Sequence, residues 1–124
     1  MRDQPLYEIK ADLFRGLAHP LRIRILELVT ESEEVPVSTL LEATGLKPAN
    51  LSQHLTVLRR YGLLTSERRG SQVYCRALDP SVSELLAAAR FVLARTLDAR
   101  ARVAEGLDSL PAAADLTADL AARP

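Results

Sequence analysis

Residues 37–61 decide the fold, and their sequence is VSTLLEATGLKPANLSQHLTVLRRY. Leucines recur on one side of two short segments: Leu40, Leu41 and Leu46 in the first segment and its turn, and Leu51, Leu55 and Leu58 in the second. Spacings of three and four residues place side chains on one face of an α-helix. The stretch therefore predicts two amphipathic helices that are joined near Gly45.

Local start and stop signals support both helices. Ser38 is a suitable N-cap for the first helix. Pro48 suits the first turn of the second helix, because the N–H that proline lacks would have no partner there. Gly45 follows the first helix, where a residue in the left-handed conformation commonly ends one. This order of signals favours a helix-turn-helix over the alternative, an ordinary helical hairpin.

The outer face of the second helix is polar. Gln53, Thr56 and Arg60 lie opposite the leucines, with Asn50 and Ser52 on the flanks. Such side chains can hydrogen-bond base edges and phosphates, and an α-helix fits the major groove of DNA. Gln53 is the first candidate for base readout, because its amide can bind adenine in a bidentate manner.

A β-hairpin is predicted directly after this helix, in the segment LLTSERRGSQVYCRA of residues 63–77. Apolar and polar residues alternate on both sides of a turn at residues 69–71. Placed after a recognition helix, this hairpin forms a wing whose Arg68 and Arg69 can reach a phosphate or the minor groove. The alternative is that the two arginines only keep an exposed hairpin soluble.

Charge distribution favours the DNA-binding interpretation. The whole chain is neutral, with 16 basic and 16 acidic residues. Residues 47–76 nevertheless hold six basic side chains against one acidic, whereas residues 1–46 and 77–124 are each net negative. Positive charge is thus concentrated on the segment that the helix pattern already assigns to DNA.

Three segments resemble the ArsR/SmtB family of winged-helix bacterial repressors: LAHPLRIRILELV at residues 17–29, the stretch at residues 37–64, and RRGSQVYCRA at residues 68–77. The resemblance extends from about residue 6 to about residue 107. It implies a mainly α-helical winged helix-turn-helix with a small β-hairpin wing, and a homodimeric repressor that binds an inverted repeat in double-stranded DNA. Lys47 replaces a serine that is frequent in the family, which weakens the helix cap and offers a phosphate contact.

The predicted DNA-binding set combines the recognition helix with the wing. Its members are Lys47, Asn50, Ser52, Gln53, His54, Thr56, Arg59, Arg60, Arg68, Arg69, Ser71 and Gln72. His54 is the ambiguous member. It lies near the apolar stripe of its helix and is equally compatible with a hydrogen bond to the domain's own backbone.

Metal ligands of the family are missing from the expected positions. The family's thiolate site lies on the first helix of the helix-turn-helix, where residues 35–41 contain no cysteine. Its other site, on the C-terminal helix, would here have Asp79 and Glu84 but no histidine, since none follows His54. We expect neither site to bind a metal and expect no cofactor; the inducing signal is not identified by the sequence.

Two other residues were considered as sites. Cys75 is the only cysteine, which excludes an intrachain disulfide and suits a cytosolic protein. It is expected to be a half-buried structural thiol, with a redox sensor as the alternative. His19, before Pro20, is expected to cap or pack at a helix start rather than to bind a ligand.

Apolar residues at helical spacing predict a dimerisation helix near each end of the chain. The apolar residues expected at the interface are Leu6, Ile9 and Leu13 in the N-terminal helix and Val82, Leu85, Leu86, Ala89, Leu93 and Leu97 in the C-terminal one. A second copy would bury this stripe; the alternative is a monomer with the long helix folded back. We expect one winged-helix domain at residues 1–108, a DNA-reading unit at about 37–77, and a flexible Ala- and Pro-rich tail at 109–124.

Composition excludes several functional classes. With 48% hydrophobic and 26% charged residues, the chain is expected to be soluble, globular and cytoplasmic, without a signal peptide or membrane span. The sequence shows none of the features expected of an enzyme: it has no paired acids, no nucleophile with a base, and no Gly-rich phosphate loop. The main rival to a DNA-binding regulator is a winged helix that serves as a protein-interaction module.

Overall fold

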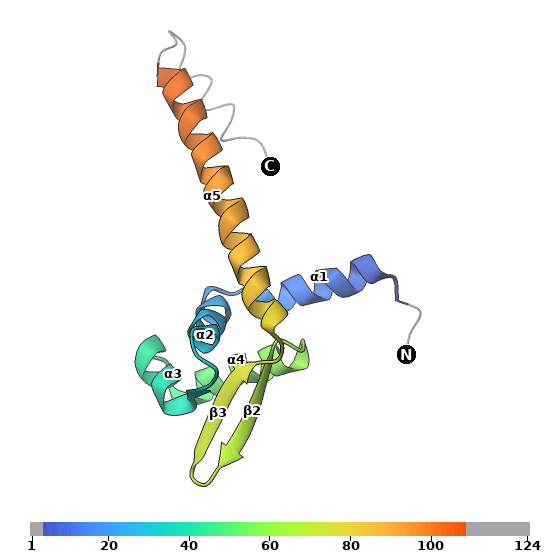
Figure 1. Ribbon diagram of the computed structural model, residues 1–124, viewed down its shortest axis with the longest axis vertical. Helices are drawn as coiled ribbons and strands as arrows, with labels where there is room; N and C mark the ends of the chain where they lie inside the picture. The colour runs from blue at the N-terminus through green and yellow to red at the C-terminus, as the bar shows by residue number, and fades with distance from the viewer. Residues whose placement is uncertain (1–3, 109–124) are drawn as a thin grey trace. The chain divides into compact units, whose positions relative to one another are not determined.

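The structure, a computed structural model, describes residues 4–108. Its elements are α1 (Leu6–Leu17), α2 (Pro20–Thr30), β1 (Val35–Pro36), α3 (Val37–Thr44), α4 (Pro48–Arg60), β2 (Leu64–Arg69), β3 (Gln72–Ala77) and α5 (Pro80–Asp108). The chain divides into two compact units, residues 1–86 and 87–124, and the boundary falls within α5. This mainly helical fold with a β-hairpin confirms the predicted winged helix-turn-helix (Figure 1).

Apolar side chains from α2, α3 and α4 form most of the core of the first unit, and α1, the strands and the start of α5 also contribute. The largest fully buried side chains are Ile25, Leu26, Val29, Leu40, Leu51, Leu58 and Cys75. Complete burial of one such aliphatic side chain contributes about 1.5–3 kcal/mol. All three leucines predicted for the inner side of the second helix are at most 5% exposed. The core therefore fixes which side of α4 faces outward.

The turn between α3 and α4 depends on Gly45. Its φ of 69° is left-handed, and its N–H donates to the carbonyl of Leu41 at 2.9 Å. A residue without Cβ adopts this conformation at little cost, as the sequence predicts. The predicted cap at Ser38 is wrong. α3 begins two residues earlier than this cap implies, directly after β1, with Pro36 in extended conformation at the N-cap and no side-chain cap.

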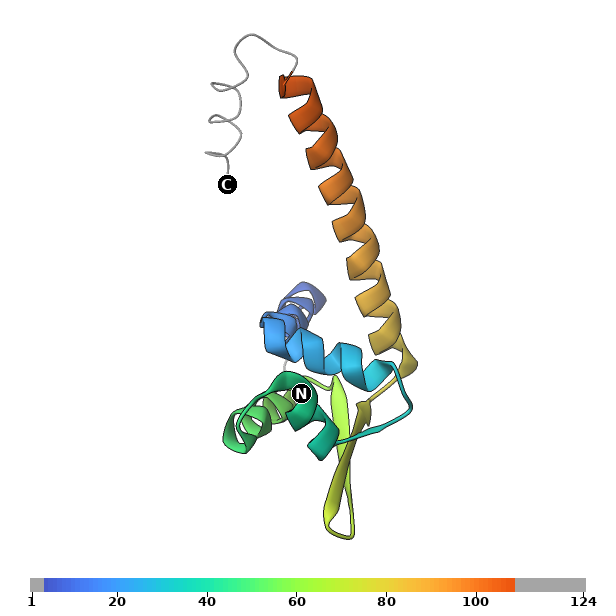
Figure 2. The ribbon, with the colours of Figure 1, turned by 90° about the vertical axis from the view of Figure 1, so that its left-hand side faces the viewer.

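The wing belongs to a three-stranded antiparallel sheet of order β1-β3-β2. Sequence reasoning missed β1, which has only two residues and pairs Val35 with Cys75 and Pro36 with Tyr74. Proline is tolerated there because β1 is an edge strand. The β2–β3 ladder continues to Arg69 and Gln72, past the end of β1. The tip of the hairpin is thus two-stranded and extends beyond the helices of this unit (Figures 1 and 2).

The second unit contains the rest of α5, from residue 87 to residue 108. Large apolar side chains along it are exposed, namely Phe91, Val92, Leu93, Leu97 and Val103. Across residues 4–108, no helix has the length and apolar character that crossing a membrane requires. The predicted tail at residues 109–124 lies outside the described residues.

α1 and α4 approach each other closely at Gly16. A Cβ atom at this position would lie 2.7 Å from Cγ and Cδ2 of Tyr61, the residue that caps the C-terminus of α4. Real Cβ atoms essentially never lie this close to another heavy atom. Glycine is therefore required by packing rather than by backbone conformation.

We expect Gly16→Ala to lower the free energy of unfolding by about 1–3 kcal/mol, because the Tyr61 ring must move to admit the methyl group. Urea denaturation followed by circular dichroism measures this change. In a Tyr61→Ala background the same substitution should cost less, since the ring is gone. Equal costs in the two backgrounds would contradict the contact.

Candidate nucleic-acid interface

α4 presents the polar face that its sequence predicts. Asn50, Ser52, Gln53, Thr56 and Arg60 are all exposed, opposite the buried leucines. Of these five, all but Thr56 have no side-chain hydrogen bond or ion pair within residues 4–108. Their donors and acceptors are therefore available to an external partner.

The N-terminal end of α4 is also open. Lys47 occupies the N-cap and makes no side-chain cap hydrogen bond, which confirms the weak cap expected at this position. Its side chain is exposed. The first N–H groups of a helix carry partial positive charge, so this end adds to the attraction for an anion.

Arg59 connects α4 to the wing. Its Nη1 donates to Ser66 Oγ on β2 at 3.0 Å, and its Nη2 donates to Thr56 Oγ1 at 3.3 Å. Thr56 Oγ1 in turn donates to the carbonyl of Ser52 at 2.9 Å. Arg59 and Thr56, both predicted to bind DNA, are thus partly engaged within the domain, and Arg59 orients the wing relative to the recognition helix.

The two wing arginines lie on opposite faces of the hairpin. Successive side chains on a strand alternate between faces, so Ser66 and Arg68 share the face that contacts α4, and Arg69 lies on the other. Arg68 is exposed and has no ion pair among the described residues. Arg68 therefore lies on the α4 side of the hairpin and is available to an external partner.

Arg69 is held by its own domain. Its guanidinium pairs with Glu34, lies 4.1 Å from the ring centroid of Tyr74, and places Nε 3.7 Å from Oε1 of Glu67. The bond from Arg69 holds the pKa of the Glu34 carboxyl below its usual range. The predicted role of Arg69 as a phosphate contact thus competes with two carboxylates and an aromatic ring.

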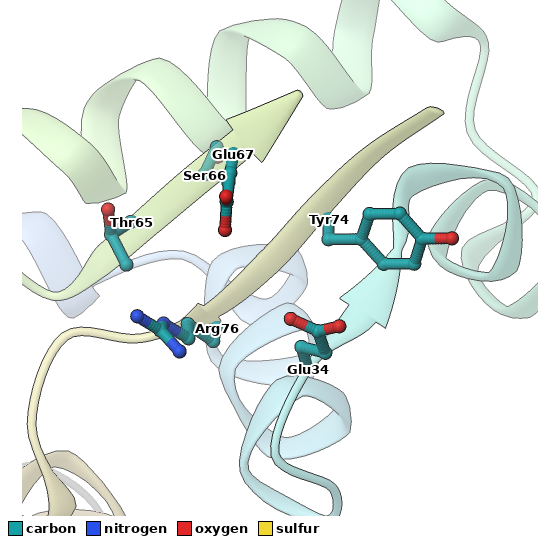
Figure 3. A pocket seen from close by; sticks show the side chains of 6 residues that line it. All are labelled: Glu34, Thr65, Ser66, Glu67, Tyr74 and Arg76. Atoms are coloured by element: carbon teal, nitrogen blue, oxygen red, sulfur yellow. The ribbon is translucent and has the colours of Figure 1, made fainter. Parts of the chain in front are cut away.

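Sequence reasoning missed Glu34, which lies 35 residues before Arg69. Glu34, Tyr74 and Arg76 line a small hollow of about 120 Å³ on the outer face of the sheet, together with Thr65, Ser66 and Glu67. Figure 3 shows the Glu34 side chain, next to β1, beside this face of β3. The one sequence signal for this position is that neighbouring residues of an extended segment point to opposite sides. Because Val35 is apolar and faces the core, Glu34 would be expected on the outer side.

The remaining wing residues of the predicted set, Ser71 and Gln72, are exposed at the turn and the start of β3. Neither makes a side-chain hydrogen bond within the described part of the chain. They lie at the tip of the hairpin, where a wing approaches the DNA backbone.

His54 does not face outward. Its ring is half-buried and lies against His19, with 4.5 Å between the ring centroids. Burial lowers the pKa of His54, and the nearby His19 and Arg22 lower it further. The ring packs at the start of α2, which favours the domain-facing alternative for His54, and its role in DNA binding stays a prediction. His19 caps α2 as expected, with Nδ1 accepting from the N–H of Leu21 at 3.1 Å.

Cys75 is more deeply buried than expected, with no exposed surface. Burial raises the pKa of the thiol, against a smaller opposing effect of the Ser66 hydroxyl at 3.6 Å and of Arg59. Because the thiolate is the reactive form, this environment favours the structural interpretation over the redox one.

The residues predicted for a dimer interface fall into two groups. Val82 is 6% exposed in the core of its own chain, and Leu13, Leu85 and Leu86 pack partly against that core. The others, Leu6, Ile9, Ala89, Leu93 and Leu97, are exposed. Val82 is accordingly a core residue here, because the first turns of α5 complete the core of the first unit.

Potential metal ligands do not cluster in the described part of the molecule. Within residues 4–108, no three His, Cys, Asp or Glu side chains are grouped so that they could hold a metal ion. The expectation that neither family site binds a metal stays a prediction.

Comparisons with known proteins agree with this geometry. Residues 17–67 match the helix-turn-helix domain family. The uncharacterized HTH-type transcriptional regulator Rv0081 of Mycobacterium tuberculosis is 47% identical over 107 residues, covering 86% of this chain and 94% of that protein. The HTH-type transcriptional repressor SmtB of the same organism is 32% identical over 81 residues, 65% of this chain and 59% of that protein. The chain belongs to the ArsR/SmtB family.

Solved structures place this ArsR/SmtB protein among winged-helix domains. The crystal structure of Rv0081 superposes with a TM-score of 0.74 at 48% identity, covering 80% of this chain and 99% of that one. The homodimeric winged helix-turn-helix DNA-binding domain of Mb0332 from Mycobacterium bovis has a TM-score of 0.65 at 28% identity, covering 75% and 90%. The protein is thus a transcriptional regulator with the family's DNA-binding fold.

We expect the stability of this ArsR/SmtB protein to fall as pH drops below about 6.5, the ordinary pKa of histidine. The pKa of His54 is lowered in the folded protein, so the unfolded chain binds the proton first and is favoured by acid. Urea denaturation at a series of pH values measures the slope. His54→Gln should reduce the slope between pH 7.5 and pH 5.5, and an unchanged slope would contradict the assignment.

Proposed function

We propose that the protein is a homodimeric repressor that binds an inverted-repeat operator and does not use the metal sites of its family. The observation that carries the proposal is the surface formed by α4 and Arg68. On it, the unpaired Asn50, Gln53 and Arg60 lie on the same side as an unpaired wing arginine. Such a surface combines base readout with phosphate contact.

Exposed apolar surface on α1 and α5 supports dimerisation. Leu6 and Tyr7 on α1 are 65% and 73% exposed, and Phe91 on α5 is 63% exposed. Exposed patches of large apolar side chains, taken on each helix separately, commonly mark an interface. A second copy is the expected occupant, since the relative Mb0332 is described as homodimeric. Two recognition helices would then read half-sites about 34 Å apart, one turn of DNA.

Repression is the expected outcome of binding at a promoter. A signal that favours a non-binding arrangement of the dimer would release the DNA, and a coupling of about 1–3 kcal/mol would suffice. The absence of cysteine from residues 35–41 and of histidine from α5 directs the search for that signal away from metals bound there.

The proposal is tested by fluorescence anisotropy with a labelled duplex from upstream of the protein's own gene, a scrambled duplex, two salt concentrations and a chelator. We expect tight, salt-sensitive binding with preference for the first duplex, and two chains bound per duplex in a stoichiometric titration. Binding without preference for any upstream duplex, or without salt dependence, would overturn the proposal in favour of a protein-interaction module.

Two variants separate base readout from phosphate contact. Gln53→Ala should cost about 1–3 kcal/mol on the operator and little on scrambled DNA, because it removes contacts to a base edge. Arg68→Ala should weaken binding to both duplexes and reduce the salt slope by about one. Equal losses on both duplexes for both variants would refute these roles.

A further inference from the structure

The tip of the wing lacks a third strand. β1 pairs only with Cys75 and Tyr74 of β3, so the last pairs of the hairpin, Arg68 with Val73 and Arg69 with Gln72, have no neighbour on the β1 side. A two-stranded hairpin alone is marginally stable in water. The tip therefore needs another contact if Arg68 is to be held in a fixed position.

The side chain of Arg69 supplies that contact. It begins at the tip, crosses the ring of Tyr74 at 4.1 Å from its centroid, and pairs with Glu34 just before β1. An arginine can stack on a ring and pair with a carboxylate at the same time because its guanidinium is planar. Both partners are partly shielded, since the side chains of Arg69 and Glu34 are 45% and 32% exposed.

We propose that Glu34, Tyr74 and Arg69 form a clamp that holds the wing in its DNA-binding position, and that Glu34 and Arg69 are positioning residues rather than DNA contacts. The proposal rests on the proposed DNA binding. Arg69 lies on the face opposite α4, and its charge is already matched by Glu34 and Glu67. Arg68, one residue earlier, lies on the α4 side and remains available to phosphate.

A double-mutant cycle with Glu34→Ala and Arg69→Ala tests the clamp. We expect each single variant to bind the operator about two- to fivefold more weakly, the range for exposed ion pairs, and the double variant to bind no more weakly than the weaker single one. The salt slope should equal that of wild type, because no phosphate contact is lost.

Glu31→Ala is the matched control for charge. Glu31 is exposed, three residues before Glu34, and forms no ion pair within residues 4–108. Its removal changes the net charge as Glu34→Ala does but leaves Arg69 in place. Relative to this control, Glu34→Ala should bind more weakly. Tighter or equal binding would show that Glu34 merely competes with DNA, and would overturn the clamp.

The remaining outcomes separate the clamp from the proposed function. Additive losses in the cycle, or a salt slope reduced by about one in Arg69→Ala, would make Arg69 a phosphate contact and overturn the clamp. If wild type shows no preference for any operator, the proposed function fails, and amide hydrogen exchange of the free protein decides the clamp. Exchange at residues 67–74 should be faster in both single variants than in wild type. In the double variant it should be no faster than in the faster single variant. Exchange that is unchanged from wild type in the single variants would overturn the clamp.

Discussion

Burial of one side of α4 is the constraint on which the rest of this molecule depends. Leu51, Leu55 and Leu58 lie in the core at 5% exposure or less, and a helix attached by such a stripe cannot rotate without exposing it. The orientation of Gln53 and Arg60 follows from these contacts. Hydrophobic packing thus determines which polar groups are presented, although it contributes no recognition chemistry.

A second level of order links the wing to that helix. The hydrogen bonds from Arg59 to Ser66 and Thr56 join α4 to β2 on the inner face, and the contacts of Arg69 act on the outer face. The hairpin is therefore held from both sides. The basic residues of α4 and the wing therefore have two roles. Arg59 and Arg69 make contacts within the domain, whereas Arg68 remains available to an external partner.

Most of the fold could be predicted from the sequence because its signals are local. Leucine spacing, Gly45 and the alternation around residues 69–71 gave both helices and the hairpin. The rest could not be predicted for two reasons. β1 is too short to show periodicity, and the position of His54, which the sequence left open, depends on His19, the distant N-cap residue of α2. Glu34 is 35 residues from Arg69, so no window of local pattern contains both. The candidate site was therefore predicted as a set of exposed residues. The sequence did not show which of them are paired within the domain, as Arg69 is, and which are free, as Arg68 is.

Complete burial gives Cys75 a further use. Its thiol is the only one in the chain and lies on the buried face of β3, a strand that pairs with both β1 and β2. A thiol reagent can reach it only when this sheet opens, so the rate of modification in the native protein is the intrinsic rate multiplied by the open fraction. The protein thus carries a natural reporter of wing opening, which needs no introduced cysteine and leaves the DNA-facing residues unmutated.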